Sequence, residues 1–296
     1  MGIGMKKLLV FILMLSLLLC VGCTNTATYD VVATTLPVYE FTAFLCQGTD
    51  ITTGLLVTEN VSCLHDYTLK VDQMRMIEDA EIVVISGAGL EDFLEDVLYG
   101  KSLIDTSVNV HIRENGQQHD HEHHKDHGHN HENDPHIWLA PENAKVMAGN
   151  ICSELSKQYP NYQEVFQQNL SVLQNDLNAL KHYGDIQLSD LRTRNLVTFH
   201  DGFAYFAESF DLTILEAIEE ESGSEASAEE IIHLIQLVNN NALPAVFVER
   251  SGSDACAGII QAETGAKIYT LDMSMAGNSY FDAMYHNIDT IKEALG

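Results

Sequence analysis

Three side chains able to bind a metal ion follow apolar, β-rich runs of the sequence. His65 comes a short loop after such a run, whereas His200 and Asp272 each directly follow one. Open α/β sheets bind their ligands in the crevice beyond the carboxyl ends of the strands. We therefore expect these three side chains to converge at that edge.

A further histidine, His136, lies in the segment 134–139, which reads Asp-Pro-His-Ile-Trp-Leu. The proline restricts the backbone beside the histidine, and the bulky apolar residues after it anchor the segment, so the imidazole has a rigid mount. Three imidazoles and one carboxylate fit tetrahedral coordination of Zn²⁺. Calcium and magnesium prefer oxygen ligands throughout, so the residue types favour zinc.

A second group of histidines forms a low-complexity segment in which acidic residues lie between the imidazoles. Its members are His119, His121, His123, His124, His127, His129 and His131. Such residues build no packed core, so we predict an exposed loop over 117–133 that binds metal. Ordering a flexible loop around an ion costs conformational entropy. We therefore expect this loop to be an auxiliary, low-affinity collector beside a tighter principal site.

The elements that must position these residues alternate between β-rich runs and helical segments on both sides of a helical middle. Short apolar runs such as 81–86 and 245–248 favour parallel sheets that are covered on both faces. The middle carries one apolar stripe at alternating spacings of four and three residues, as in a single long helix, formed by Phe166, Leu170, Leu173, Leu177 and Leu180.

Pro160 suits the start of this helix and Gly184 suits its stop. A surface helix of one domain would show the same stripe, but its length and central place favour a connection between two lobes. The predicted fold is α/β, with two βα lobes that contain parallel sheets and are joined by one long helix. The expected boundaries are an N-terminal lobe over 29–160, a linking helix over 161–184 and a C-terminal lobe over 185–296.

Charge and composition narrow the class of protein. Of 296 residues, 46% are hydrophobic, which is ordinary globular composition and excludes a disordered or fibrous chain. Against 15 Lys and Arg stand 43 Asp and Glu, and the net charge is −28. Such a surface repels nucleic acid and attracts cations.

The N-terminal residues predict export and a lipid anchor. Residues 1–22 have a short basic region and an apolar run of about a dozen residues, too short for the roughly 20 that span a bilayer. Cys23 ends a segment similar to the bacterial lipobox, although Cys20 stands where leucine is usual. We expect removal of 1–22, lipid on Cys23, a tether over 23–28, and a location on the outer face of the bacterial cytoplasmic membrane.

Four cysteines remain in the mature chain, and an oxidising compartment allows three ways of pairing them. The sequence does not choose between these pairings, and four free buried thiols are the alternative. The residues are Cys46, Cys63, Cys152 and Cys256.

The chain resembles the metal-binding lipoproteins and periplasmic proteins that serve zinc or manganese ABC importers. The resemblance covers essentially the whole mature sequence and is carried by 134–139 with the following 141–144, by 103–107, and by 280–287. It implies two βα lobes joined by one long rigid helix, with the metal in the cleft between them.

The resemblance also implies a ligand set, which falls by local motif on His65, His136, His200 and Asp272. Manganese members tend to carry a carboxylate in place of the third histidine, so His200 favours zinc, as does a histidine-rich loop. The family's proline directly before the first histidine is missing here. Glu59, or water, is the alternative to Asp272 as fourth ligand.

The resulting hypothesis is a receptor without catalysis that captures Zn²⁺ and delivers it to the permease and ATPase of an ABC importer. We expect it to be a monomer. A manganese receptor of the same type is the alternative. A zinc hydrolase is disfavoured, because no His-Glu-x-x-His occurs: Lys125 and Pro135 stand where the second histidine would be needed.

Overall fold

The structure is a computed structural model that describes residues 28–59, 64, 67–113, 133–218, 227–250, 255–275, 277 and 279–296. Several predictions concern residues outside these ranges. They are the signal peptide, the lipidation of Cys23, the position of His65, any pairing of Cys63, and all seven histidines of the loop.

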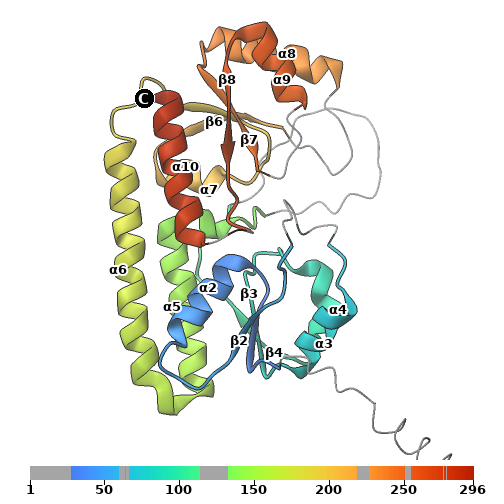
Figure 1. Cartoon of the computed structure of the whole chain (residues 1–296), viewed down its shortest axis with the longest axis vertical. Helices are drawn as coiled ribbons and strands as arrows, with labels where there is room; N and C mark the ends of the chain where they lie inside the picture. Colours follow the sequence, from blue (N-terminus) through green and yellow to red (C-terminus); the bar gives the residue numbers. More distant parts are fainter. Residues whose placement is uncertain are drawn as a thin grey trace, which may run out of the picture.

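The first lobe is a parallel four-stranded sheet with helices on both faces (Figure 1). Its strands are β1 (Val31–Ala33), β2 (Thr53–Leu55), β3 (Ile82–Ile85) and β4 (Ser102–Asp105), in the order β2-β1-β3-β4. Its helices are α2 (Leu36–Leu45), α3 (Val71–Asp79) and α4 (Glu95–Leu98), the last preceded by a 3₁₀ turn, Asp92–Leu94.

Alternate residues of the central strands enter different cores, as the two-residue period of a strand requires. In β1, Val31 packs in the cluster that contains Phe41 of α2, whereas Val32 packs in the cluster that contains Ile77 of α3. In β3, Val83 joins Val32 on the second face. Both faces of the sheet are therefore buried, which explains the unbroken apolar runs.

The second lobe repeats this plan. Its strands are β5 (Asn195–Thr198), β6 (Thr213–Ala217), β7 (Ala245–Glu249) and β8 (Lys267–Leu271), all parallel in the order β6-β5-β7-β8. Its helices are α7 (Ala204–Ser209), α8 (Ala228–Asn240), α9 (Ala255–Thr264) and α10 (Tyr280–Leu295). The two parallel sheets confirm the predicted α/β fold with two lobes.

Two long helices lie along one side of the molecule (Figure 1). After a 3₁₀ turn, Ile137–Leu139, helix α5 (Pro141–Gln158) packs along α6 (Gln163–Gln187), and a second 3₁₀ turn, Pro160–Tyr162, joins them. Figure 1 shows α6 lying beside both lobes. The predicted stop at Gly184 is wrong, because α6 continues through it to Gln187. Phe210 of the second lobe packs there, and an added Cβ would lie 2.2 Å from its Cε1.

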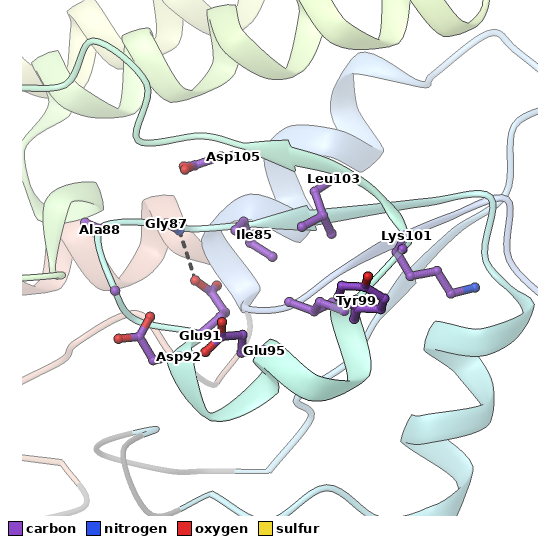
Figure 2. A pocket seen from close by; sticks show the side chains of 13 residues that line it. Ile85, Gly87, Ala88, Glu91, Asp92, Glu95, Tyr99, Lys101, Leu103 and Asp105 are labelled. Atoms are coloured by element: carbon purple, nitrogen blue, oxygen red, sulfur yellow. Dashed lines mark hydrogen bonds between the residues drawn. The ribbon is translucent and has the colours of Figure 1, made fainter. Parts of the chain in front are cut away.

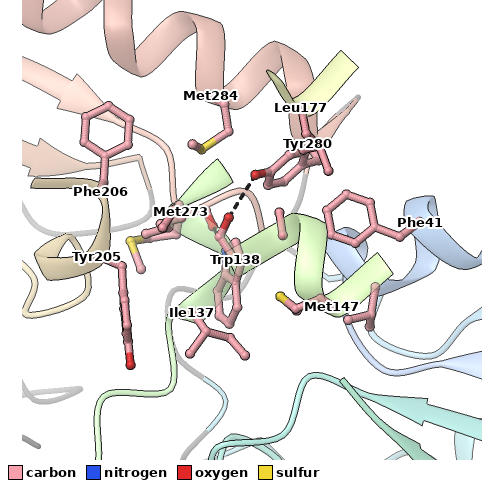
Figure 3. Packing of buried hydrophobic residues seen from close by; sticks show 14 of the residues in the cluster. Phe41, Ile137, Trp138, Met147, Leu177, Tyr205, Phe206, Met273, Tyr280 and Met284 are labelled. Carbon is pink, nitrogen blue, oxygen red and sulfur yellow. Dashed lines mark hydrogen bonds between the residues drawn. The ribbon is translucent and has the colours of Figure 1, made fainter. Parts of the chain in front are cut away.

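One apolar cluster continues from the first lobe into the second (Figure 3). Phe41 of α2 meets Tyr280 of α10 edge to face, with ring centroids 5.0 Å apart. The Trp138 indole Nε1 donates to the carbonyl of Met273 at 2.8 Å, and the Tyr280 hydroxyl donates to the carbonyl of Trp138 at 2.9 Å. Trp138 is thus fixed from the side of the second lobe.

A buried glutamate, Glu91, holds the loop that follows β3 (Figure 2). Its carboxylate accepts hydrogen bonds from the Thr34 hydroxyl at 2.6 Å and from the backbone N–H groups of Ser86 and Gly87 at 2.7 and 2.9 Å. The side chain borders an open cavity of about 420 Å³ lined also by Tyr99. Burial raises the pKa of Glu91 to about 7.

Three cysteines of the described residues, Cys46, Cys152 and Cys256, are buried in the apolar cores. Cys46 and Cys152 are free, buried thiols, and burial raises the pKa of both, that of Cys46 to about 12. In the part of the chain that the structure describes, no helix combines the length and apolar character needed to cross a membrane.

Candidate metal centre

Two imidazoles from different parts of the chain point at each other between the lobes. His136 precedes the 3₁₀ turn before α5, and His200 lies two residues beyond β5. Their Nε2 atoms are 3.4 Å apart, and the rings meet edge to face with centroids 5.2 Å apart. His136 is buried at 6% exposure, whereas His200 is partly exposed. The pair is thus reachable from solvent on one side.

Asp134 fixes the orientation of the His136 ring. Its Oδ1 lies 2.8 Å from His136 Nδ1 and also accepts the His136 backbone N–H at 3.0 Å. A carboxylate accepts, so Nδ1 carries the hydrogen and the lone pair of Nε2 faces His200. Tyr205, whose hydroxyl donates to the Asp134 carbonyl at 3.1 Å, ties this segment to the second lobe.

The separation of the two nitrogens matches that of two ligands on one metal ion. Zn²⁺ binds imidazole nitrogen at about 2.0–2.1 Å in tetrahedral geometry, which places two such nitrogens about 3.4 Å apart. Gly202 keeps room here, because a Cβ at that position would lie 3.0 Å from His200 Nε2 and 2.3 Å from Met273 Cε.

Asp272 directly follows β8 and is buried at 6% exposure. Its backbone is held by Asn287, which accepts from the Asp272 N–H at 2.8 Å and donates to its carbonyl at 2.7 Å. Its Oδ1 accepts the Ser274 N–H at 2.8 Å, and its Oδ2 lies 3.2 Å from Arg250 Nη2. The carboxylate is therefore well fixed at the carboxyl edge of the second sheet.

A second buried carboxylate, Glu249, ends the neighbouring strand β7. Its Oε2 lies 3.7 Å from His200 Nδ1, beyond hydrogen-bond length. Burial raises the pKa of Glu249 to about 7; nearby His136 opposes this rise and nearby Asp272 adds to it. The carboxyl edges of β5, β7 and β8 thus bring His200, Glu249 and Asp272 to one region.

The alternative ligand Glu59 is engaged elsewhere. It pairs with Lys70 and accepts the Tyr67 hydroxyl at 2.6 Å. The hydrogen bond from Lys70, followed by that from Tyr67, lowers the pKa of Glu59 to about 2. Glu59 would have to leave these partners to bind a metal ion.

A sequence model of one protein family, described as zinc-uptake complex component A, periplasmic (ZnuA), matches residues 31–294. The chain belongs to the ZnuA family. The match covers nearly all described residues of both lobes. A family of zinc-uptake components agrees with the expectation of a receptor and not of an enzyme.

Several individual proteins are similar to this chain, along most of its length or along about half of it. The zinc-binding lipoprotein AdcA of Streptococcus pneumoniae (strain TIGR4) is 29% identical in an alignment 311 positions long. The alignment covers 98% of this chain and 61% of AdcA. The manganese ABC transporter substrate-binding lipoprotein PsaA of Streptococcus mitis is 27% identical over 173 residues, 55% of this chain and 56% of PsaA. A crystal structure of ZnuA, 28% identical, superposes with a TM-score of 0.77 over 91% of this chain and 100% of that one.

The structure brings together His136 and His200 of the four predicted ligands and places Asp272 at the carboxyl edge of the second sheet. His65 lies outside the described residues. Among those that are described, no three or more His, Cys, Asp or Glu side chains form a group that could hold a metal ion. The full ligand set therefore stays a prediction.

Sequence reasoning did not assign a role to Asp134, Glu249 or Arg250. Asp134 belongs to the motif that carries the resemblance, but its role depends on a hydrogen bond to a ring two residues away. Glu249 directly follows the predicted run 245–248, as His200 and Asp272 follow theirs, so the same signal could have found it.

Proposed function

We propose that this member of the ZnuA family is an extracytoplasmic receptor that captures Zn²⁺ and delivers it to a membrane ABC importer. The observation that supports this function most strongly is the 3.4 Å separation of the His136 and His200 Nε2 atoms, one buried and one accessible. A metal ion entering between them needs little rearrangement of either ring.

The ligands we assign are His136, His200 and Asp272, with His65 as the fourth. Asp272 is favoured over Glu59 because it lies at the carboxyl edge of the sheet whose strand β5 precedes His200. Glu59 lies in the first lobe, just after β2, where it pairs with Lys70 and accepts the Tyr67 hydroxyl. Four protein ligands would close the coordination sphere, as expected of a carrier that does no chemistry on the ion.

The types of ligand atom assigned here favour zinc over manganese. Imidazole nitrogen suits zinc, whereas manganese is better served by carboxylate, carbonyl and water oxygens. The relative PsaA is named as a manganese protein, so a manganese receptor is the alternative. Zinc in this role is cargo, and only ligand exchange occurs at the site.

The remaining parts of the proposal concern location and partners. Lipid on Cys23 would hold the receptor, as a monomer, at the outer face of the membrane, next to the permease and ATPase of its importer. The histidines between 119 and 131 would collect zinc weakly. The net charge of −28 would favour the approach of cations.

A titration of the metal-free protein with zinc and with manganese, under chelator competition, tests this function. Three variants sharpen it: His200→Ala, deletion of 119–131, and His233→Ala as a control on an exposed histidine that pairs with Glu216. We expect His200→Ala to abolish tight zinc binding, while the deletion and the control leave it largely intact. Tight binding that disappears with the loop and survives His200→Ala would contradict the proposal, and tighter binding of manganese than of zinc would favour the alternative.

A further inference from the structure

Asp272 has a cationic partner in the structure. Its Oδ2 lies 3.2 Å from Nη2 of Arg250, and its Oδ1 accepts a hydrogen bond from the Ser274 N–H. The Asp272 side chain is only 8% exposed, whereas that of Arg250 is 51% exposed. The carboxylate of the pair is thus buried in the molecule, and the guanidinium lies at its surface.

The backbone places Arg250 in this position. Strands β7 and β8 pair in parallel with Glu249 opposite Leu271. The Arg250 N–H donates to the Leu271 carbonyl at 3.1 Å, directly before Asp272. The arginine therefore follows its strand beside the aspartate, and its guanidinium reaches the carboxylate.

A guanidinium and a zinc ion compete for the same carboxylate. Arginine keeps its charge at all physiological pH values, so it cannot relieve its repulsion of a bound cation by losing a proton. Its side chain is long, flexible and half exposed, so it can swing into water. Asp272 is held by Ser274 and Asn287 and cannot follow it.

We propose that Arg250 is a displaceable internal counter-ion of Asp272, which occupies the carboxylate in the metal-free receptor and accelerates zinc release by returning to it. This inference rests on the proposed function and on Asp272 as a ligand. On this inference, Arg250 lowers the affinity of the receptor for zinc below what the ligands alone would provide. It also raises the rate at which zinc dissociates.

Stopped-flow release of zinc into excess chelator tests this role. We expect zinc to leave Arg250→Gln about three- to tenfold more slowly than the wild type, with a matching gain in affinity, because a partly exposed ion pair of this kind contributes a modest free energy. Arg250→Lys keeps the charge and should stay near the wild type. Lys267→Gln removes one positive charge at the opposite end of β8 and controls for the change in net charge.

The double variant Arg250→Gln with Asp272→Asn shows whether the two residues act together. Once the carboxylate is absent, Arg250→Gln should change release no more than Lys267→Gln does. Thermal unfolding of each metal-free variant establishes that it is folded.

Release from Arg250→Gln at the wild-type rate, or faster, would overturn the inference, as would an equal effect of the substitution with and without Asp272. Failure of the wild type to bind zinc in the same assay would instead overturn the proposed function. The two failures are therefore distinguishable.

Discussion

At the scale of single residues, the hydrogen bond between Asp134 and His136 decides which ring nitrogen is available for a metal ion. The neutral imidazole has one donor and one acceptor nitrogen, and Asp134 accepts from Nδ1 at 2.8 Å. The other nitrogen then faces His200 with its lone pair. Because both Asp134 and His136 are buried, no water competes effectively for this contact.

We expect Asp134→Ala to weaken zinc binding about 10- to 100-fold, the usual effect of losing such a partner of a metal-binding histidine. Asp134→Asn should keep much of the affinity, because its amide oxygen still accepts from Nδ1. In the metal-free protein, the ¹⁵N chemical shifts of His136 should show hydrogen on Nδ1 in the wild type and a shift towards Nε2 in Asp134→Ala. Zinc affinity equal to that of the exposed control Asp211→Ala would count against this role.

The sequence could identify His136, His200 and Asp272 as candidates because each stands at a strand end or on a rigid mount. It could not assign Asp134 or Arg250, because the chemistry of each depends on which atom it faces. Asp134 is indistinguishable by type from the many exposed aspartates of this acidic chain. Its role follows from burial and from one distance.

At the scale of elements, the strands that the sequence missed are edge strands. β4 shows one buried residue in four, and none of the five residues of β6 is fully buried. Both lie at the edges of their sheets, and neither forms an apolar run like those at 81–86 and 245–248, which predict β3 and β7. Helix α3 was missed for a similar reason, since only Gln73 and Ile77 of it are buried.

Because α6 packs against the second lobe, substitution of glycine by alanine should change the free energy of unfolding in opposite directions at two helical positions. Gly184→Ala would place a Cβ 2.2 Å from Phe210 and should lower the free energy of unfolding by about 1–3 kcal/mol. Gly149→Ala in α5 meets no atom within 4 Å and should raise it by about 0.5–1 kcal/mol, because alanine loses less conformational entropy. Urea unfolding of the metal-free protein measures both. Equal effects of the two substitutions would show that Phe210 does not pack against α6 in solution.

Glu91 predicts a pH dependence of stability in the loop after β3. Its pKa is about 7 in the folded protein against an ordinary value of 4.5, mainly because of burial. The folded state therefore holds the proton more tightly than the unfolded state does. The resulting stabilisation is present below about pH 4.5 and is lost as the pH rises through about 7, by about 3 kcal/mol at most.

Urea unfolding of the metal-free protein between pH 5 and 8 measures this contribution. The decline in stability with rising pH should be smaller in Glu91→Gln, which has no proton to lose, than in the wild type. Glu95→Gln, at an exposed position of α4, should keep the wild-type slope. Parallel curves for the wild type and Glu91→Gln would show that Glu91 does not titrate in this range.

At the scale of the whole molecule, the two lobes are held around the candidate metal centre by contacts between distant parts of the chain. Trp138 and Met273, which are hydrogen bonded, are 135 positions apart. Local periodicity predicted the two sheets and the long helix, since those depend on neighbouring residues. How the lobes meet depends on packing across such separations, which no local pattern encodes.

The most direct test of the account is the position of zinc in a crystal of the loaded protein, located by anomalous scattering at the zinc edge. We predict one fully occupied ion about 2.0–2.1 Å from the Nε2 atoms of both His136 and His200. An ion held only by imidazoles between 119 and 131, or by ligands that include neither of these two histidines, would contradict the account.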